Sequence, residues 1–118
     1  MFDNLHEVLI LPDGTVEQAM QHIERTAYRT DGRGVVCVVD SDSRLLGILT
    51  DGDIRRSLLA DASLHTQVSK VMNRSPTVAR VGASPHLLLR LFDNHVRQIP
   101  LVDEDGRVVD LLLYSSFS

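Results

Sequence analysis

The sequence predicts an α+β fold of two β-α-β-β-α repeats, with small mixed sheets packed on helices and a pseudo-twofold axis relating the repeats. A strand–turn–strand pattern occurs twice, with Val35 matching Gln98 and Asp40 matching Asp103, and an amphipathic helical pattern precedes each copy. The chain has 118 residues, which suits one compact domain or two small repeats that share a core. Because half of this chain cannot bury both faces of a sheet alone, the two halves should pack together.

The first repeat is expected to begin with a short strand over residues 8–11 and a helix that starts after Thr15. Thr15 and Gln18 fit a capping box, in which each side chain accepts a hydrogen bond from the other residue's backbone N–H. The apolar residues that follow recur on one helical face. They are Val16, Ala19, Met20, Ile23 and Ala27.

A hairpin is predicted over residues 35–46, where the acidic turn at 40–42 separates two aliphatic runs. A helix over 53–59 should follow it, and then a short helical stretch over 64–72. The Asn-Arg-Ser-Pro sequence after Met72 ends this stretch, since Asn, Ser and Pro favour turns.

The second repeat has the same plan, with a strand over 77–81 and a hairpin over 98–109. Between them, Ser84 is a natural N-cap and Pro85 suits the first helical position. The apolar face of this helix is expected to contain Leu88, Leu91, Phe92 and His95 or Val96.

No counterpart of the helix over 53–59 follows the apolar residues 111–113. The predicted units are therefore residues 1–64 and residues 65–118, and the second unit lacks its last helix.

The composition argues against several classes of function. Lysine plus arginine number 12 and aspartate plus glutamate 16, so the net charge of −4 does not suit nonspecific nucleic-acid binding. A single cysteine, Cys37, excludes an internal disulfide framework and indicates a reducing compartment. No apolar run approaches the roughly 20 residues of a membrane span, and the N-terminus has no signal-peptide core. We therefore expect a cytoplasmic protein with no membrane or nucleic-acid partner.

Three segments carry a resemblance to a known family. Residues 47–56 read Gly-Ile-Leu-Thr-Asp-Gly-Asp-Ile-Arg-Arg, residues 68–72 read Val-Ser-Lys-Val-Met, and residues 98–103 read Gln-Ile-Pro-Leu-Val-Asp. Together they resemble a tandem cystathionine-β-synthase (CBS) domain pair, also called a Bateman module, over nearly the whole chain. The first segment matches the family pattern of a glycine, two hydrophobic residues, threonine, two variable residues and aspartate.

The resemblance implies that Thr50 and Asp53 contact the phosphate and ribose of adenosine ligands. An aspartate carboxylate can accept hydrogen bonds from two ribose hydroxyls, and a threonine hydroxyl can meet a phosphate beside free N–H groups of a helix start. The alternative is that Asp53 only caps its helix. Arg55 and Arg56 are candidates for a bidentate phosphate contact, or for a solvated helix face or an ion pair with a carboxylate of another subunit.

The resemblance also implies an adenine pocket at Ile10, Leu11 and the stretch Gly34, Val35 and Val36. Such a pocket needs apolar walls and backbone groups, and glycines in the preceding loop let the backbone approach a flat ring. The alternative is an ordinary helix-to-strand loop, with both valines in the core in either case.

No catalytic residue, metal or resident cofactor is expected. An apolar strand followed by Asp51-Gly52-Asp53 superficially resembles the start of aspartyl phosphatases, but the chain has one lysine, Lys70, and no room for their larger sheet. The five histidines show no metal-ligand spacing. Cys37 lies among valines, as a buried small hydrophobe does.

The predicted function is regulatory sensing of an adenine nucleotide or related adenosyl compound: AMP, ADP, ATP or S-adenosylmethionine. The alternative is a ligand-free dimerisation module. The resemblance narrows to CBS pairs fused to sugar nucleotidyltransferases or to sugar-phosphate isomerases. The nucleotidyltransferase arrangement is favoured because the pair begins within the first ten residues.

Two further expectations concern stoichiometry. Apolar helix positions, namely Leu58, Leu59, Leu88 and Phe92, are expected to pack two pairs into a homodimer. Each chain should bind at most one nucleotide, because the alignment of the two repeats puts Leu113 at the position of Thr50 and Ser116 at that of Asp53.

Overall fold

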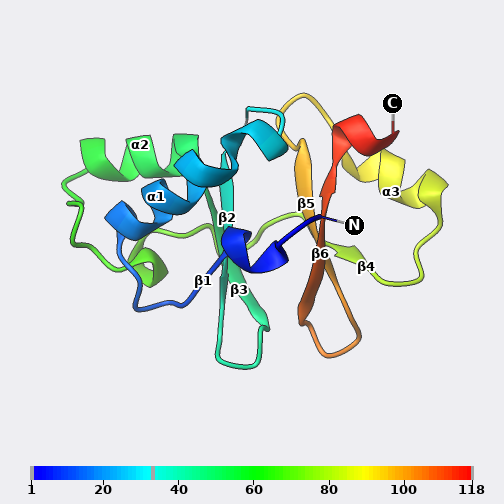
Figure 1. The fold of residues 1–118 in the computed structure, drawn as a ribbon, viewed down its shortest axis with the longest axis horizontal. Coiled ribbons are helices and arrows are strands. Elements are labelled where there is room, and N and C mark those ends of the chain that lie inside the picture. The colour runs from blue at the N-terminus through cyan, green and yellow to red at the C-terminus, as the bar shows by residue number, and fades with distance from the viewer. Residues whose placement is uncertain (1, 33, 118) are drawn as a thin grey trace.

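Two three-stranded sheets lie side by side at the centre of the computed structural model, which describes residues 2–32 and 34–117 (Figure 1). The first sheet has the order β1-β2-β3 and the second β4-β5-β6. In each, a short first strand runs parallel to the middle strand, which forms an antiparallel hairpin with the third. The strands are β1 Leu9–Ile10, β2 Val35–Val39, β3 Leu45–Thr50, β4 Ala79–Arg80, β5 Gln98–Val102 and β6 Val108–Leu113. The predicted α+β architecture is confirmed.

Helices cover the outer sides of the two sheets (Figure 1). The first sheet carries α1, Val16–Thr26, and α2, Asp51–Leu59, whereas α3, Pro85–Leu91, lies by the second sheet. Short 3-10 turns complete the described secondary structure: η1 Leu5–Val8, η2 Ala27–Arg29, η3 Val68–Lys70 and η4 Tyr114–Phe117.

The two hairpins repeat in register, as the sequence predicts. Val35 pairs with Thr50 in the first hairpin, and their counterparts in the second, Gln98 and Leu113, pair in the same way. Both hairpins shift register at the equivalent step, after Val38 and after Leu101. The turns have a common cause, because the first aspartate of each accepts backbone hydrogen bonds from two residues that follow it.

The first helices of the repeats are not equal in length. The stretch from the N-cap to the middle strand is shorter in the second repeat, from Ser84 to Gln98, than in the first, from Thr15 to Val35. α1 accordingly has 11 residues and α3 has 7. The predicted helical face through His95 or Val96 is therefore wrong, because the backbone becomes extended at Phe92.

The side chains of β2 point alternately to its two faces, so this strand contributes to the core on both sides. Val36 and Val38 pack with α1 and α2, while Cys37 and Val39 pack against the second repeat. Every residue of β2 is buried, so the apolar run of the sequence corresponds to a strand covered on both faces.

Backbone hydrogen bonds also link the hairpin turns of the two repeats. The Leu45 N–H donates to the Gly106 carbonyl at 3.0 Å, and the Val108 N–H donates to the Ser43 carbonyl at 2.9 Å. These two bonds are equivalent, because Leu45 matches Val108 and Ser43 matches Gly106 when the repeats are aligned. The pseudo-twofold axis therefore passes between Arg44 and Arg107, which form an isolated antiparallel bridge.

The segment after α2 follows the first sheet instead of forming the predicted helix over 64–72. The Val68 N–H donates to the Gly14 carbonyl at 2.8 Å, and Asn73 pairs with Ile48 of β3 through two backbone hydrogen bonds. Only η3 is helical in this stretch, because backbone groups of the segment are bonded to distant parts of the same chain. The division at 64/65 stays a prediction from sequence.

Candidate functional site

A cavity of about 220 Å³ lies between the end of β3 and the loop that leads into β5. We call it the first cavity. Three predicted site residues line it: Val35, Thr50 and Asp53. The other described residues around it are Ile48, Asn73, Ser75, Thr77, His95, Val96, Arg97 and Gln98.

Thr50 and Asp53 form a reciprocal capping box at the start of α2. The Asp53 N–H donates to the Thr50 hydroxyl oxygen at 3.2 Å, and the Thr50 N–H donates to Asp53 Oδ2 at 3.1 Å. Thr50 is the N-cap and the helix begins at Asp51, so the predicted helix start at Asp53 is two residues late. Gly52 consequently lies inside the first helical turn rather than in a sharp turn before it.

Capping leaves both side chains with unused hydrogen-bonding capacity. The Thr50 oxygen accepts a bond, but its O–H is still a donor. Asp53 is also bonded by Arg56, whose Nη2 donates to Oδ1 at 2.8 Å, and the Asp53 side chain is 22% exposed. A carboxylate has about four acceptor sites, so capping and ligand binding are chemically compatible here.

Asp93 holds the loop that forms the opposite wall. Its Oδ1 accepts hydrogen bonds from the N–H groups of His95 and Val96, each at 2.7 Å. These two bonds hold the pKa of the Asp93 carboxyl below its usual range, Val96 having the larger effect. Asp93 thus helps to fix the loop that carries Arg97 towards the cavity, together with the backbone bond from the Asp93 N–H to the Val96 carbonyl at 3.0 Å.

The arginines predicted at this site lie apart from one another. Arg56 is paired with Asp53, but its side chain is 67% exposed and it does not line the first cavity. Arg55 lines a different groove, between α1 and α2, beside Met20 and Leu58. Their phosphate contacts stay predictions that this arrangement does not favour.

The residues predicted around adenine are also dispersed. Ile10 and Val36 are buried in the core beneath α1, and Leu11 is 50% exposed beside a separate hollow. Gly34 is buried, and a Cβ there would collide with Ile23 of α1. Side chains alternate along β2, so Val35 reaches the first cavity whereas Val36 points to the helices.

Sequence reasoning missed the contribution of the second repeat. The available signal was the pseudo-twofold relation itself, because such an axis brings the end of β3 in one repeat next to the start of β5 in the other. The segment from His95 to Gln98 is that start. Gln98 also ties the repeats together, since its Nε2 donates to the Thr30 carbonyl at 3.0 Å.

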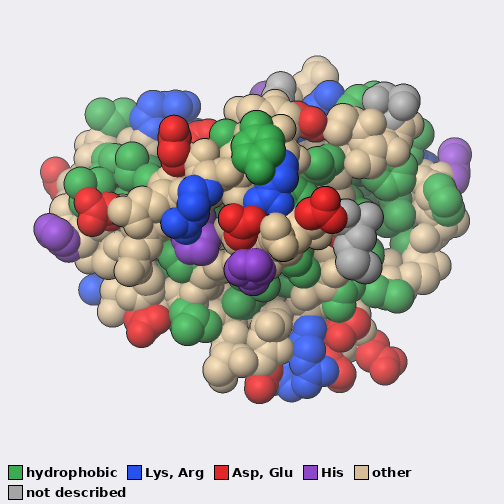
Figure 2. Space-filling model, in the orientation of Figure 1, with side chains coloured by type: hydrophobic (Ala, Val, Ile, Leu, Met, Phe, Trp, Pro, Cys, Tyr) green, Lys and Arg blue, Asp and Glu red, His purple; other side chains and the backbone are tan. Residues whose placement is uncertain are grey.

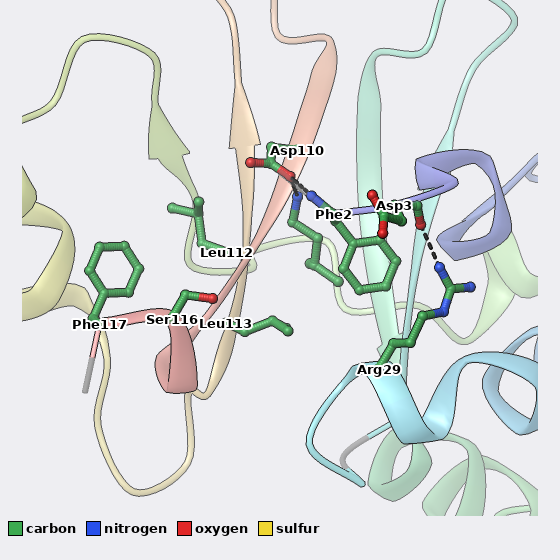
Figure 3. A pocket seen from close by; sticks show the side chains of 9 residues that line it. Phe2, Asp3, Arg29, Asp110, Leu112, Leu113, Ser116 and Phe117 are labelled. Carbon is green, nitrogen blue, oxygen red and sulfur yellow. Dashed lines mark hydrogen bonds between the residues drawn. The ribbon is translucent and has the colours of Figure 1, made fainter.

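A second cavity, of about 330 Å³, occupies the equivalent place at the end of β6 (Figure 3). Leu113 and Ser116 stand where the first cavity has Thr50 and Asp53. Its other lining residues are Phe2, Asp3, Arg29, Asp110, Leu111, Leu112 and Phe117. Figure 3 shows the N-terminal segment lying along it, with the Phe2 N–H donating to Asp110 and Arg29 bonded to the Asp3 carbonyl.

The rest of the described chain offers little chemistry of other kinds. Among the residues described, no group of three or more His, Cys, Asp or Glu side chains is placed to hold a metal ion, and no helix is long and apolar enough to cross a membrane. Burial raises the pKa of the Cys37 thiol to about 12, so it is no nucleophile. Acidic, basic and histidine side chains are intermixed on the face that Figure 2 shows.

A family model described as "CBS domain" matches residues 5–60 and 68–116. Among curated proteins, an uncharacterized protein of Chlamydia muridarum is 38% identical over 96 residues, which are 78% of this chain and 28% of that protein. The arabinose 5-phosphate isomerase GutQ of Escherichia coli K12 is 29% identical over 107 residues, 87% of this chain and 31% of the isomerase. The chain thus spans about a third or less of the length of these relatives.

Solved structures share the fold. The cytosolic domain of the Mg2+ channel MgtE in complex with ATP is 28% identical with a TM-score of 0.75, over 92% of this chain and 42% of that one. A CBS domain structure named NE2398 is 30% identical, with a TM-score of 0.72 over 93% and 83% of the two chains. CBSX2 in complex with AMP is 21% identical, with a TM-score of 0.71 over 92% and 82%.

Proposed function

Because the chain belongs to the CBS domain family, as a tandem pair, we propose that it is a regulatory module that binds an adenine nucleotide in its first cavity. The observation that carries this proposal is the meeting of Thr50, Asp53 and Arg97 at one cavity. They supply a hydroxyl, a carboxylate and a guanidinium, which suit a phosphate and a ribose. The ATP complex of the MgtE cytosolic domain supports this choice of ligand class.

Regulation would act through the packing of the two repeats. Thr50 and Asp53 belong to the first repeat and Arg97 to the second, so one ligand in this cavity would contact both repeats. A ligand that binds one packing more tightly shifts the population towards it, by no more than the difference in affinity. AMP, ADP, ATP and S-adenosylmethionine are the compounds to compare.

The catalytic partner that we propose is a sugar-phosphate enzyme in the same polypeptide. The sequence favoured a nucleotidyltransferase, but the curated relative described above that has a named enzymatic activity is an arabinose 5-phosphate isomerase. We therefore prefer an isomerase as the attached domain. Such a sensor of adenine nucleotides would work in the cytoplasm, where the free thiol of Cys37 also stays reduced.

A second function, dimerisation, is favoured by apolar side chains exposed on the helices. Leu59 of α2 is 81% exposed, and Met20 of α1 is 41% exposed. On α3, Leu87 is 54% exposed. Two predicted interface residues contribute less, because Phe92 is buried and Leu88 packs against the same core cluster.

Asp53→Ala tests the nucleotide site. Loss of the carboxylate should weaken AMP binding by about 1.5–3 kcal/mol, the range for hydrogen bonds to charged groups. It should also cost about 1 kcal/mol of stability through the lost capping bond. Isothermal titration calorimetry measures the first effect and urea unfolding the second.

The matched control is Ser116→Ala, at the equivalent position of the second cavity. This variant should bind AMP as the wild type does. Unchanged AMP affinity in Asp53→Ala would show that the ligand site lies elsewhere.

A further inference from the structure

We propose that Tyr114 positions Arg97 as the phosphate-binding cation of the first cavity. The inference rests on the proposed function and deepens it, because it assigns the residues that distinguish a nucleotide from a nucleoside. Tyr114 begins η4 at the end of β6, outside the cavity lining. It is a positioning residue, since it acts on the ligand through Arg97.

Arg97 is the cation that the cavity offers to a phosphate. Among the residues that the structure describes, it is the one arginine or lysine that lines the first cavity. The nearby Arg56 is already bonded to Asp53 and is largely exposed. No carboxylate of the described residues forms an ion pair with the Arg97 guanidinium. The pKa of the nearby Asp93 carboxyl is lowered most by the backbone hydrogen bond from Val96 and least by the charge of Arg97, so this charge stays available to a phosphate in the cavity.

The ring of Tyr114 holds this guanidinium in place. The Arg97 Cζ atom lies 3.8 Å from the ring centroid, well inside the distance of about 6 Å at which a cation and an aromatic face attract. The Tyr114 N–H also donates to the Arg97 carbonyl at 3.0 Å. Stacking uses the flat face of a guanidinium and leaves its in-plane N–H groups free to donate to phosphate oxygens.

Tyr114 itself packs against the buried hydrophobic cluster of the second repeat, formed by Ala79, Phe92 and Ile99. Its ring meets that of Phe92 edge-on, with centroids 5.7 Å apart, and Phe92 is 8% exposed. When the repeats are aligned, Tyr114 stands at the position of Asp51 in the first repeat. Tyr114 therefore departs from the repeat pattern at the end of β6, and through Arg97 it supports the first cavity.

The test compares AMP with adenosine, which lacks the phosphate, by calorimetric titration. Tyr114→Leu should lower the affinity for AMP about two- to fivefold and leave that for adenosine unchanged. Tyr114→Phe keeps an aromatic face and should keep the wild-type ratio. Tyr28→Leu is the control, because it removes a ring that stacks on a different arginine, Arg29.

Arg97→Gln completes a double-mutant cycle. It should lower AMP affinity about tenfold or more, and adding Tyr114→Leu in this background should cost nothing further. An independent readout is the Arg97 Nε–H resonance, whose ring-current shift should vanish in Tyr114→Leu and persist in Tyr114→Phe.

Equal losses for AMP and adenosine in Tyr114→Leu, or additive losses in the cycle, would overturn the positioning role while leaving the nucleotide site in place. Binding of neither compound by the wild-type chain would overturn the proposed function and this inference with it.

Discussion

Two aspartates shape the first cavity in different ways. Asp53 completes the cap of α2 and also faces the cavity, whereas Asp93 fixes a loop without facing it. The resemblance to CBS pairs indicated Asp53 as a site residue, because the family pattern that joins it to Thr50 lies within a few consecutive residues. It could not predict Arg97, since that residue reaches the cavity only through the packing of one repeat on the other.

Cys37 is predicted to be inert in the folded chain. Its thiol is buried and its pKa is raised to about 12, so Ellman's reagent at pH 8 should react only as fast as the chain unfolds. A folded chain whose thiol reacts at the rate of a free cysteine would contradict this burial.

The same thiol should make stability depend on pH in the alkaline range. In the unfolded chain the cysteine loses its proton near pH 8.5, whereas the folded thiol keeps it up to about pH 12. The unfolded state therefore binds fewer protons, and stability falls as pH rises through this window. Urea unfolding of Cys37→Ala should lack this part of the decline.

At the scale of elements, sequence patterns predicted the structures that depend on interactions between residues close in sequence. Both hairpins follow from polar turns between aliphatic runs, and the N-caps Thr15 and Ser84 were placed correctly. The helix α3 was predicted, but its early end at Leu91 was missed because the apolar pattern continues past the point where Asp93 bonds to the loop backbone. The segment around η3 was misassigned because its backbone bonds go to residues distant in sequence, including Gly14.

Gly47→Ala should destabilise the fold. A Cβ at this buried position would lie 2.7 Å from the Asn73 carbonyl oxygen, which is held by its bond to Ile48. Overpacking of this kind costs about 1–3 kcal/mol, measured here by urea unfolding.

Gly52→Ala is the control with the opposite sign. Its Cβ would meet the guanidinium end of the largely exposed Arg56 side chain, at 3.0 Å from Nη1, and this flexible side chain can shift. Alanine should therefore stabilise α2 by about 0.5–1 kcal/mol. A Gly47→Ala variant as stable as Gly52→Ala would show that the segment after α2 does not lie where we describe it.

At the scale of the whole molecule, the two cavities are equivalent in place and different in chemistry. The second has Leu113 in place of a threonine and the carboxylate of Asp110, which repels a phosphate. Its arginine, Arg29, is already paired with Glu7 at 2.6 Å. We predict one AMP per chain in a calorimetric titration. A ratio of two, or binding that survives Asp53→Ala and fails in Ser116→Ala, would assign the nucleotide to the second cavity.

The homodimer is a further prediction at this scale. Light scattering at tens of micromolar should give about twice the chain mass of 13.1 kDa. Leu59→Asp should shift the mass towards the monomer by placing a charge on the exposed face of α2. Tyr28→Ser, at a residue that is also 81% exposed but lies outside the three α-helices, should leave the dimer intact.

The backbone bridge between Arg44 and Arg107 gives the molecule a pivot. The first cavity opens at the other end of β3, five residues along the strand or about 17 Å away. If the repeats turn about this bridge, each sheet moves as a rigid arm, and the side-chain bond from Gln98 to the Thr30 carbonyl must adjust at the cavity end. A change of about 1 Å in the span that a ligand bridges would rotate one repeat against the other by about 3°. Angular displacement of the outer helices, rather than local rearrangement, would then be the signal to the attached domain that we propose.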